Sequence, residues 1–215
     1  MPETLLAQTA TADSPLRYLA LGDSYTMGEG VPEAAGWPAQ LARALRMDGI
    51  AMADPTIIAA TGWSTDELAA AIDAAAPHSD YDLVSLLIGV NNQYRDRPVD
   101  EYRDEFDALL QRAIGLARSR PGRVLVLSIP DWGVTPFAHD RDAAAIARAV
   151  DAFNAAARSA CAQRGAAFVD ITAASRAHGA EAAMLVQDGL HPSPLMYAEW
   201  VRLALDTARS LLATR

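Results

Sequence analysis

A serine, a histidine and an aspartate in this chain have the types and the spacing needed for nucleophilic acyl transfer. Ser24 lies in the motif GDSY at 22–25, and Asp188 and His191 lie in DGLHP at 188–192. Because Asp188 and His191 are three positions apart, a tight turn can bring the carboxylate to the imidazole Nδ1–H. The other ring nitrogen, Nε2, is then free to take a proton from a hydroxyl. These residues predict a hydroxyl nucleophile with an oriented base.

Two further residues could stabilise the negative charge that develops on a carbonyl oxygen. Gly62 and Asn91 follow apolar runs at 56–60 and 83–88 that are predicted to be strands, and together with the other candidates they could supply donors to that oxygen. Taken alone, each candidate has a simpler explanation. Ser24, Asn91 and Asp188 could cap helices or turns. Gly62 could be a turn glycine and His191 a solvated surface residue, so the functional interpretation depends on all of them occurring together.

Four short motifs together resemble those of the SGNH/GDSL hydrolase family. They are GDSY at 22–25, the glycine of ATGWST at 60–65, GVNN at 89–92 and DGLHP at 188–192, in the order that the family has. They span nearly the whole domain. The G-x-S-x-G motif of α/β-hydrolases is not matched, because Thr26 occupies the position of its second glycine.

The resemblance implies a role for each of the candidate residues. Ser24 is expected to be the nucleophile, with Asp188 and His191 as the other members of a catalytic triad. The oxyanion hole is expected to consist of the Ser24 N–H, the Gly62 N–H and the Asn91 side chain. The resemblance also implies a flavodoxin-like sheet.

Several neighbours of the motif residues need their own interpretation. Asn92 stands where many family members carry aspartate, which leaves the bonding around this motif open. Asp23 is expected to bond to the backbone rather than to belong to the triad. Arg95 and Arg97 could meet an anionic substrate, but solvated surface arginines are the simpler interpretation.

The predicted activity is that of a serine esterase that hydrolyses carboxylic esters through an acyl-enzyme, without a cofactor or metal. Short- to medium-chain acyl esters or lysophospholipid-like esters are the expected small-molecule substrates. The alternatives are a deacetylase of acetylated carbohydrate, or a thioesterase or acyltransferase on the same site. A nucleotide- or flavin-binding domain has little support, because neither G-x-G-x-x-G nor a P-loop follows the first predicted strand. The complete set of site residues argues against a catalytically silent interaction protein.

Aromatic residues near the predicted loops could line an acyl pocket. The candidate substrate-binding residues are Trp63, Tyr94, Trp132 and Phe137. Together with Trp37 they form a group of which at least half is expected to pack in the core. The segment 131–140 is expected to form a lid or a wall of the pocket.

Alternating apolar runs and amphipathic segments predict a single three-layer α/β domain with a five-stranded, mostly parallel sheet and helices on both faces. Strands are predicted over 18–21, 56–60, 83–88, 124–129 and 167–169. Helices are predicted over 38–47, over 68–76 after a capping box at 64–67, and from apolar stripes in 99–119, 146–157 and 197–211. The loops after the carboxyl ends of such strands form the binding crevice, where the candidate residues lie.

Composition limits the possible partners and locations. The net charge of −9 makes nucleic acid an improbable partner, and all 18 basic residues are arginine, which excludes lysine chemistry. Cys161 is expected to be a buried small side chain. Residues 1–14 are expected to be an arm before a domain over 15–215. The N-terminal segment has an acid where a signal peptide needs basic residues, and its apolar stretch is too short for an anchor, so a cytoplasmic location is expected; a processed secreted form would look the same. The oligomeric state is open.

Overall fold

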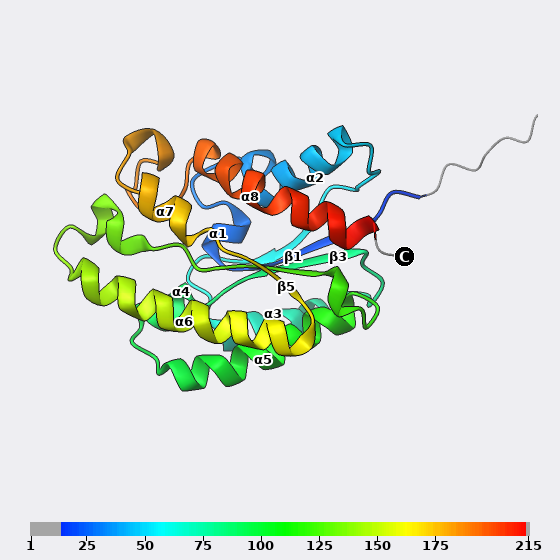
Figure 1. Ribbon diagram of the computed structural model, residues 1–215, viewed down its shortest axis with the longest axis horizontal. Coiled ribbons are helices and arrows are strands. Elements are labelled where there is room, and N and C mark those ends of the chain that lie inside the picture. Colours follow the sequence, from blue (N-terminus) through cyan, green and yellow to red (C-terminus); the bar gives the residue numbers. More distant parts are fainter. Residues whose placement is uncertain (1–13, 214–215) are drawn as a thin grey trace, which may run out of the picture.

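A computed structural model describes residues 14–213 of the chain (Figure 1). Five strands form one parallel sheet in the order β2-β1-β3-β4-β5. The strands are β1 (Tyr18–Gly22), β2 (Thr56–Ala59), β3 (Leu83–Leu87), β4 (Val124–Leu127) and β5 (Ala167–Val169). This is the strand order of flavodoxin-like sheets, so the predicted fold class is confirmed.

The helices form two layers, one on each face of the sheet. They are α1 (Ser24–Met27), α2 (Trp37–Met47), α3 (Thr65–Ala75), α4 (Val90–Tyr94), α5 (Val99–Leu116), α6 (Ala143–Arg164), α7 (Thr172–His178) and α8 (Pro194–Ala213). Figure 1 shows α1, α2, α7 and α8 on one side of the sheet and α3, α4, α5 and α6 on the other. Because both faces are covered, the central strands β1, β3 and β4 are wholly buried and, apart from Ser85 in β3, consist of apolar residues and glycine.

Local sequence signals account for where several helices begin and end. The Glu67 carboxylate accepts the Ser64 N–H at 2.8 Å, so the predicted capping box begins α3. The apolar stripe over 99–119 predicts a longer helix than the structure contains. Helix α5 ends at Leu116 because Arg118 and Ser119 adopt left-handed backbone conformations, with φ of 58° and 56°.

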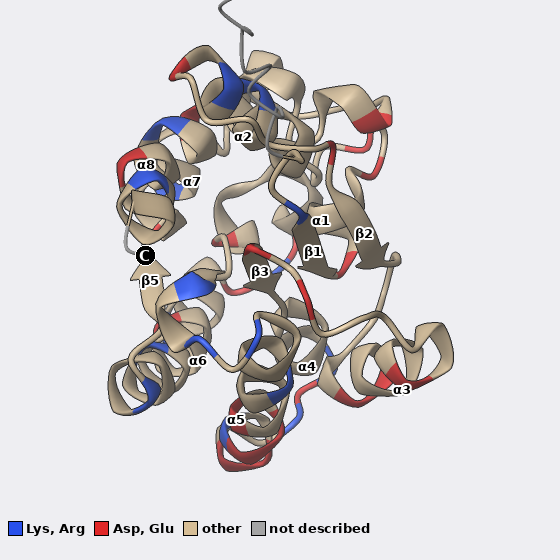
Figure 2. Cartoon of the chain, turned by 90° about the vertical axis from the view of Figure 1, so that its right-hand side faces the viewer, with Lys and Arg blue, Asp and Glu red and all other residues tan. Residues whose placement is uncertain are grey.

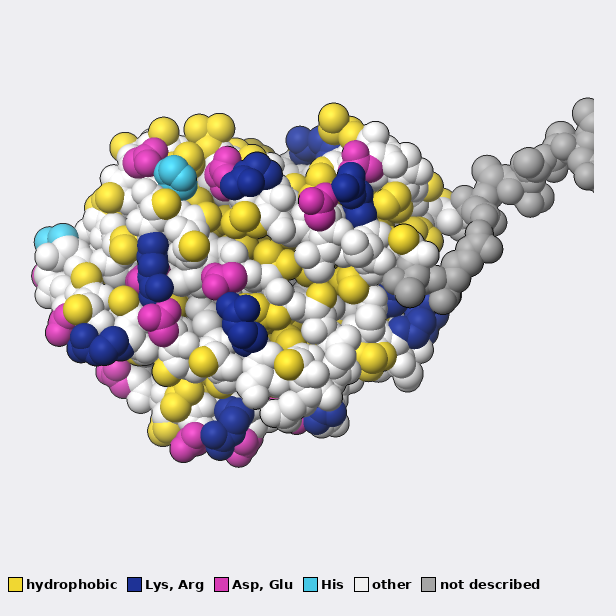
Figure 3. Space-filling view, in the orientation of Figure 1, with side chains coloured by type: hydrophobic (Ala, Val, Ile, Leu, Met, Phe, Trp, Pro, Cys, Tyr) yellow, Lys and Arg dark blue, Asp and Glu magenta, His cyan; other side chains and the backbone are white. Residues whose placement is uncertain are grey.

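Charged residues of both signs are interspersed along the outer helices (Figure 2). On the face shown in Figure 3, many arginine side chains lie beside acidic ones. Cys161 is buried on α6, as predicted, and burial raises the pKa of its thiol to about 12. Among residues 14–213, no helix combines the length and the apolar character needed to cross a membrane. The predicted arm over 1–14 lies outside the described residues, apart from Ser14.

Candidate active site

Ser24 and His191 come from opposite ends of the chain and meet beyond the carboxyl end of β1. Ser24 is the first residue of α1, and its Oγ lies 3.0 Å from His191 Nε2. His191 Nδ1 lies 2.6 Å from Asp188 Oδ2. The N-cap of α1 is Asp23, whose carboxylate accepts the Tyr25 N–H at 3.0 Å. Ser24 is therefore not the helix cap, and Asp23 bonds to the backbone as predicted.

A short turn at 188–191 orients the imidazole. Asp188 Oδ1 accepts the backbone N–H groups of Leu190 and His191, at 2.8 and 2.9 Å, while Oδ2 faces His191 Nδ1. Burial acts to raise the pKa of Asp188, but hydrogen bonds from His191 and Leu190 outweigh it and leave that pKa below its ordinary value. Asp188 is therefore an anion near neutral pH and favours the imidazole tautomer with a proton on Nδ1.

Gly62 and Asn91 lie beside Ser24 on the wall of one cavity. Gly62 follows β2 with a φ of 83°, and its N–H has no acceptor among the described residues. Asn91 Nδ2 donates to the Trp63 carbonyl at 2.9 Å, which uses one of its two amide hydrogens. The Ser24 N–H is in the first turn of α1, where backbone donors have no partner within the helix. The Ser24 N–H, the Gly62 N–H and the second Asn91 amide hydrogen thus have no acceptor among the described residues.

Gly89 determines how the chain passes from β3 to α4 and so where Asn91 lies. Its φ is 126°, and a Cβ at this position would lie only 2.4 Å from Tyr102 Cε2. Tyr102 is fully buried on α5, and its hydroxyl donates to the Ile88 carbonyl at 3.2 Å. Only glycine combines this backbone conformation with such a close approach, so the first residue of the motif GVNN is needed for packing.

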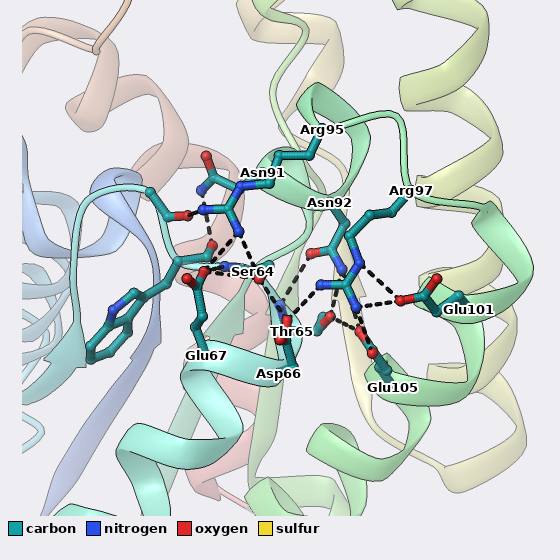
Figure 4. Close-up of polar contacts among 12 residues, drawn as sticks. Ser64, Thr65, Asp66, Glu67, Asn91, Asn92, Arg95, Arg97, Glu101 and Glu105 are labelled. Carbon is teal, nitrogen blue, oxygen red and sulfur yellow. Dashed lines mark hydrogen bonds and ion pairs between the residues drawn. The ribbon is translucent and has the colours of Figure 1, made fainter.

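Asn92 occupies the position where the family pattern commonly has aspartate. Its Oδ1 accepts the Thr65 N–H at 3.1 Å, and its Nδ2 donates to Thr65 Oγ1 at 2.6 Å and to Glu105 Oε2 at 3.4 Å. The Glu105 carboxylate also accepts the Thr65 hydroxyl and pairs with Arg97 at 2.8 Å (Figure 4). The neutral amide of Asn92 therefore lies beside a carboxylate, that of Glu105 on α5.

Asp23 is a wholly buried carboxyl group with one unpartnered oxygen. Its Oδ1 accepts the Tyr25 N–H, whereas Oδ2 has no hydrogen-bond partner among the described residues. Burial raises the pKa of Asp23 to about 7, although hydrogen bonds from the Tyr25 and Asp23 N–H groups act to lower it. In the unfolded chain the pKa of an aspartate is about 3.9, so the folded protein favours the neutral acid.

Asp23→Asn is expected to make the protein less sensitive to rising pH. The folded-state pKa of Asp23 exceeds the unfolded value, so its contribution to stability is complete below about pH 4 and is lost as the pH rises through about 7. Asparagine is neutral at every pH, so the variant does not lose stability in this way as the pH rises. Thermal melts at about pH 5 and about pH 8 should show the variant gaining in melting temperature relative to the wild type at the higher pH. A difference that does not change with pH would contradict the raised pKa.

The cavity beside Ser24 has a volume of about 190 Å³. The residues that line it are Ser24, Tyr25, Thr61, Gly62, Val90, Asn91, Tyr94, Trp132, Phe137, Leu190 and His191. Three of the four candidate substrate-binding residues are among them. The Tyr94 ring lies 5.3 Å from that of Trp132 and 6.4 Å from that of Phe137, measured between centroids, so the three rings form a continuous aromatic wall.

The other two aromatic residues considered from the sequence do not line this cavity. Trp63 is half-buried against the core, and Trp37 is fully buried within it. Segment 131–140 contributes Trp132 and Phe137, so it forms one wall of the cavity. The Phe137 N–H donates to the Gly189 carbonyl at 3.1 Å, which joins this wall to the turn that holds His191.

Sequence reasoning missed four residues of the lining, namely Tyr25, Thr61, Val90 and Leu190. Each is a direct chain neighbour of a candidate residue: Ser24, Gly62, Asn91 or His191. These residues could therefore have been found from their position beside the motifs, but not from their chemical type. Their side chains add mainly apolar surface to the cavity.

Comparison with known proteins agrees with the motifs. A family model described as the GDSL-like lipase/acylhydrolase family matches residues 20–199, a range that includes every candidate triad and oxyanion residue. The resemblance drawn from the motifs is thereby confirmed. A comparison with curated protein sequences finds no match.

Solved structures share the fold over nearly their whole length. The crystal structure of TesA is 21% identical, with a TM-score of 0.72, over 91% of this chain and 99% of that one. The psychrotrophic esterase EstA from Pseudoalteromonas sp. is 15% identical, with a TM-score of 0.69, over 91% and 98%. Axe2, an acetylxylan esterase from Geobacillus stearothermophilus, is 19% identical, with a TM-score of 0.69, over 94% and 98%. At such low identities the likeness establishes the fold.

Proposed function

The chain belongs to the GDSL-like lipase/acylhydrolase family, and on this premise we propose that it is a serine esterase that hydrolyses carboxylic esters through an acyl-enzyme. The observation that carries the proposal is a chain of two hydrogen bonds. Ser24 Oγ lies 3.0 Å from His191 Nε2, and His191 Nδ1 lies 2.6 Å from Asp188 Oδ2. These distances lie within the range for proton transfer from a nucleophile to an oriented base.

The proposed mechanism has two half-reactions. His191 Nε2 takes the Ser24 proton as Oγ attacks the ester carbonyl carbon, while Asp188 holds the tautomer and stabilises the imidazolium. The tetrahedral species collapses when the carbon–oxygen bond to the alcohol breaks and His191 gives its proton to the leaving oxygen. Water then attacks the acyl-enzyme with His191 as base, which releases the acid and regenerates Ser24.

Asn91→Ala is expected to lower kcat by roughly 10²–10³-fold, with a smaller change in KM. The reason is that the Asn91 amide donates to the carbonyl oxygen most strongly when that oxygen carries negative charge, in the tetrahedral species. Steady-state kinetics with p-nitrophenyl acetate give both constants. Because Nδ2 also bonds to Trp63, a thermal melt must accompany the assay. An unchanged kcat would remove Asn91 from the proposed oxyanion hole.

The cavity supports short- to medium-chain acyl groups. Its volume of about 190 Å³ is below the range of roughly 300–1,000 Å³ that pockets for drug-sized ligands have. Its lining has no carboxylate and no arginine, and the wall formed by Tyr94, Trp132 and Phe137 presents apolar surface. An uncharged, compact acyl group therefore fits this surface better than an anionic one.

A deacetylase of acetylated carbohydrate is the second candidate, which two exposed rings favour. Tyr94 and Phe137 are 45% and 40% exposed beside the cavity, and exposed aromatic faces offer apolar surface to a sugar ring whose hydroxyls remain in water. The similar fold of the acetylxylan esterase Axe2 supports the same candidate.

A substrate panel tests the proposal and separates the alternatives. We expect purified protein to hydrolyse p-nitrophenyl esters, with kcat/KM falling as the acyl chain outgrows the cavity, and to be labelled by a fluorophosphonate probe. Faster turnover of acetylated sugars would favour the deacetylase, and faster turnover of acyl-CoA the thioesterase. Failure to hydrolyse any ester, together with failure to be labelled, would contradict the proposed function.

A further inference from the structure

We infer that Arg95 is a positioning residue for the oxyanion hole, an inference that rests on the proposed function. Arg95 is the C-cap residue of α4. Its Nη2 donates to the Gly62 carbonyl at 2.7 Å, and its Nη1 donates to Ser64 Oγ at 3.3 Å and to Glu67 at 3.1 Å (Figure 4). One guanidinium group thus ties the carbonyl of an oxyanion-donor residue to the start of α3.

Gly62 lies in a turn that the Trp63 N–H closes by donating to the Ala60 carbonyl at 3.3 Å, and few other contacts restrain it. Among residues 14–213, and apart from adjoining residues, the Arg95 guanidinium is the only group within 4 Å of the position that a Gly62 Cβ would occupy. Glycine has the greatest backbone freedom of any residue, and Gly62 adopts a left-handed φ of 83°. An oxyanion donor is effective only when it is held in place before the charge develops. The hydrogen bond from Arg95 supplies that restraint.

Helix α4 and its C-cap hold the whole loop that carries Gly62. Arg95 bonds to Gly62, Asn91 Nδ2 bonds to the Trp63 carbonyl, and Asn92 Oδ1 accepts the Thr65 N–H. The two donors outside Ser24, the Gly62 N–H and the Asn91 amide, are therefore placed by the same short helix. Loss of Arg95 would release the Gly62 end of the loop while the other two bonds remain.

A direct electrostatic effect of the Arg95 charge is the weaker explanation. The Arg95 side chain is 44% exposed and pairs with Glu67, so solvent and the carboxylate both screen its charge. Its Nη1 and Nη2 groups already donate to Gly62, Ser64 and Glu67. The contacts of Arg95 point to a geometric role, in which the fixed fork of the guanidinium matters more than the net charge.

Arg112 provides a matched control for an experiment on Arg95. It also bridges from one helix to α3 by donating to a backbone carbonyl, that of Ala69 at 3.1 Å, and by pairing with the Asp73 carboxylate. Ala69 and Asp73 do not line the cavity. Arg112→Ala therefore removes the same types of bond and the same charge, away from Gly62.

The test compares Arg95→Ala, Arg95→Gln and Arg112→Ala with the wild type, using p-nitrophenyl acetate. Fluorophosphonate titration counts the active sites, so kcat is obtained per competent molecule and partial unfolding does not affect it. We expect Arg95→Ala to lower kcat roughly 10- to 100-fold with KM changed less than about 2-fold, and millimolar guanidinium to restore part of the loss. Arg112→Ala should keep kcat within about 2-fold of the wild type. Arg95→Gln, which preserves the side-chain bulk, replaces Arg95→Ala if the latter does not fold.

The outcomes separate this inference from the proposed function. A wild-type protein that neither hydrolyses esters nor reacts with the probe would overturn the proposed function and this inference with it. An active wild type with unchanged kcat in the Arg95 variants would overturn only the role of Arg95. An equal loss of kcat in Arg112→Ala would also overturn it, because the loss would then follow from weakened packing of α3.

Discussion

Ser24→Ala is expected to lower kcat for ester hydrolysis by roughly 10⁴–10⁶-fold. The only hydrogen bond of Ser24 Oγ among the described residues is to His191 Nε2, so the change removes the proposed nucleophile and one contact. Alanine has the best helix propensity, and Ser24 is the first residue of α1, so the fold should tolerate the change. Steady-state kinetics and a thermal melt measure the two effects separately.

Ser193→Ala is the matched control for this variant. Ser193 is also buried and lies two positions after His191, but its hydroxyl donates to the Ala183 carbonyl at 2.7 Å instead of to the imidazole. Its loss should affect the melting temperature while fluorophosphonate still labels Ser24. Ser24→Ala should not be labelled at all. Labelling of Ser24→Ala, or hydrolysis by it above about one hundredth of the wild-type rate, would show that another residue is the nucleophile.

The hydrophobic pattern was sufficient to predict the layers of the fold, because it reports burial. The pattern could not predict where each strand ends, because residues beyond the last strand–strand hydrogen bond can still be buried. Ile129 was predicted to belong to the fourth strand and is indeed buried, but its N–H donates to Asn154 Oδ1 at 2.7 Å and β4 ends at Leu127. The short helices α1 and α4 were missed because four or five residues are too few to show a 3.6-residue period.

The candidate site could be predicted as far as chemical type and motif order extend. Hydrogen bonds between residues that are far apart in the sequence could not be predicted in this way. Arg95 was interpreted as surface or as a contact for an anion, and nothing in its neighbours indicates a bond to Gly62, 33 positions away. The raised pKa of Asp23 likewise depends on its complete burial in the folded chain. A local sequence pattern contains neither kind of information.

Asp188→Asn is expected to lower kcat by about 10⁴-fold while leaving the turn at 188–191 intact. Asp188 Oδ1 accepts two backbone N–H groups, so the amide oxygen of asparagine must take that position. The amide nitrogen then faces His191 Nδ1 and donates to it, which places the imidazole proton on Nε2. An imidazole protonated at Nε2 cannot accept the Ser24 proton.

Asp188→Ala separates this effect on the tautomer from a loss of structure. Alanine removes the bonds to Leu190 and His191 along with the carboxylate, so both the melting temperature and kcat should fall. Asparagine keeps the two backbone bonds, so kcat should fall while the melting temperature stays close to that of the wild type. Nitrogen-15 NMR of the His191 ring should show the proton on Nδ1 in the wild type and on Nε2 in Asp188→Asn. Should the proton remain on Nδ1 in an inactive Asp188→Asn, the carboxylate would act chiefly through its charge on the imidazolium rather than through the tautomer that it selects.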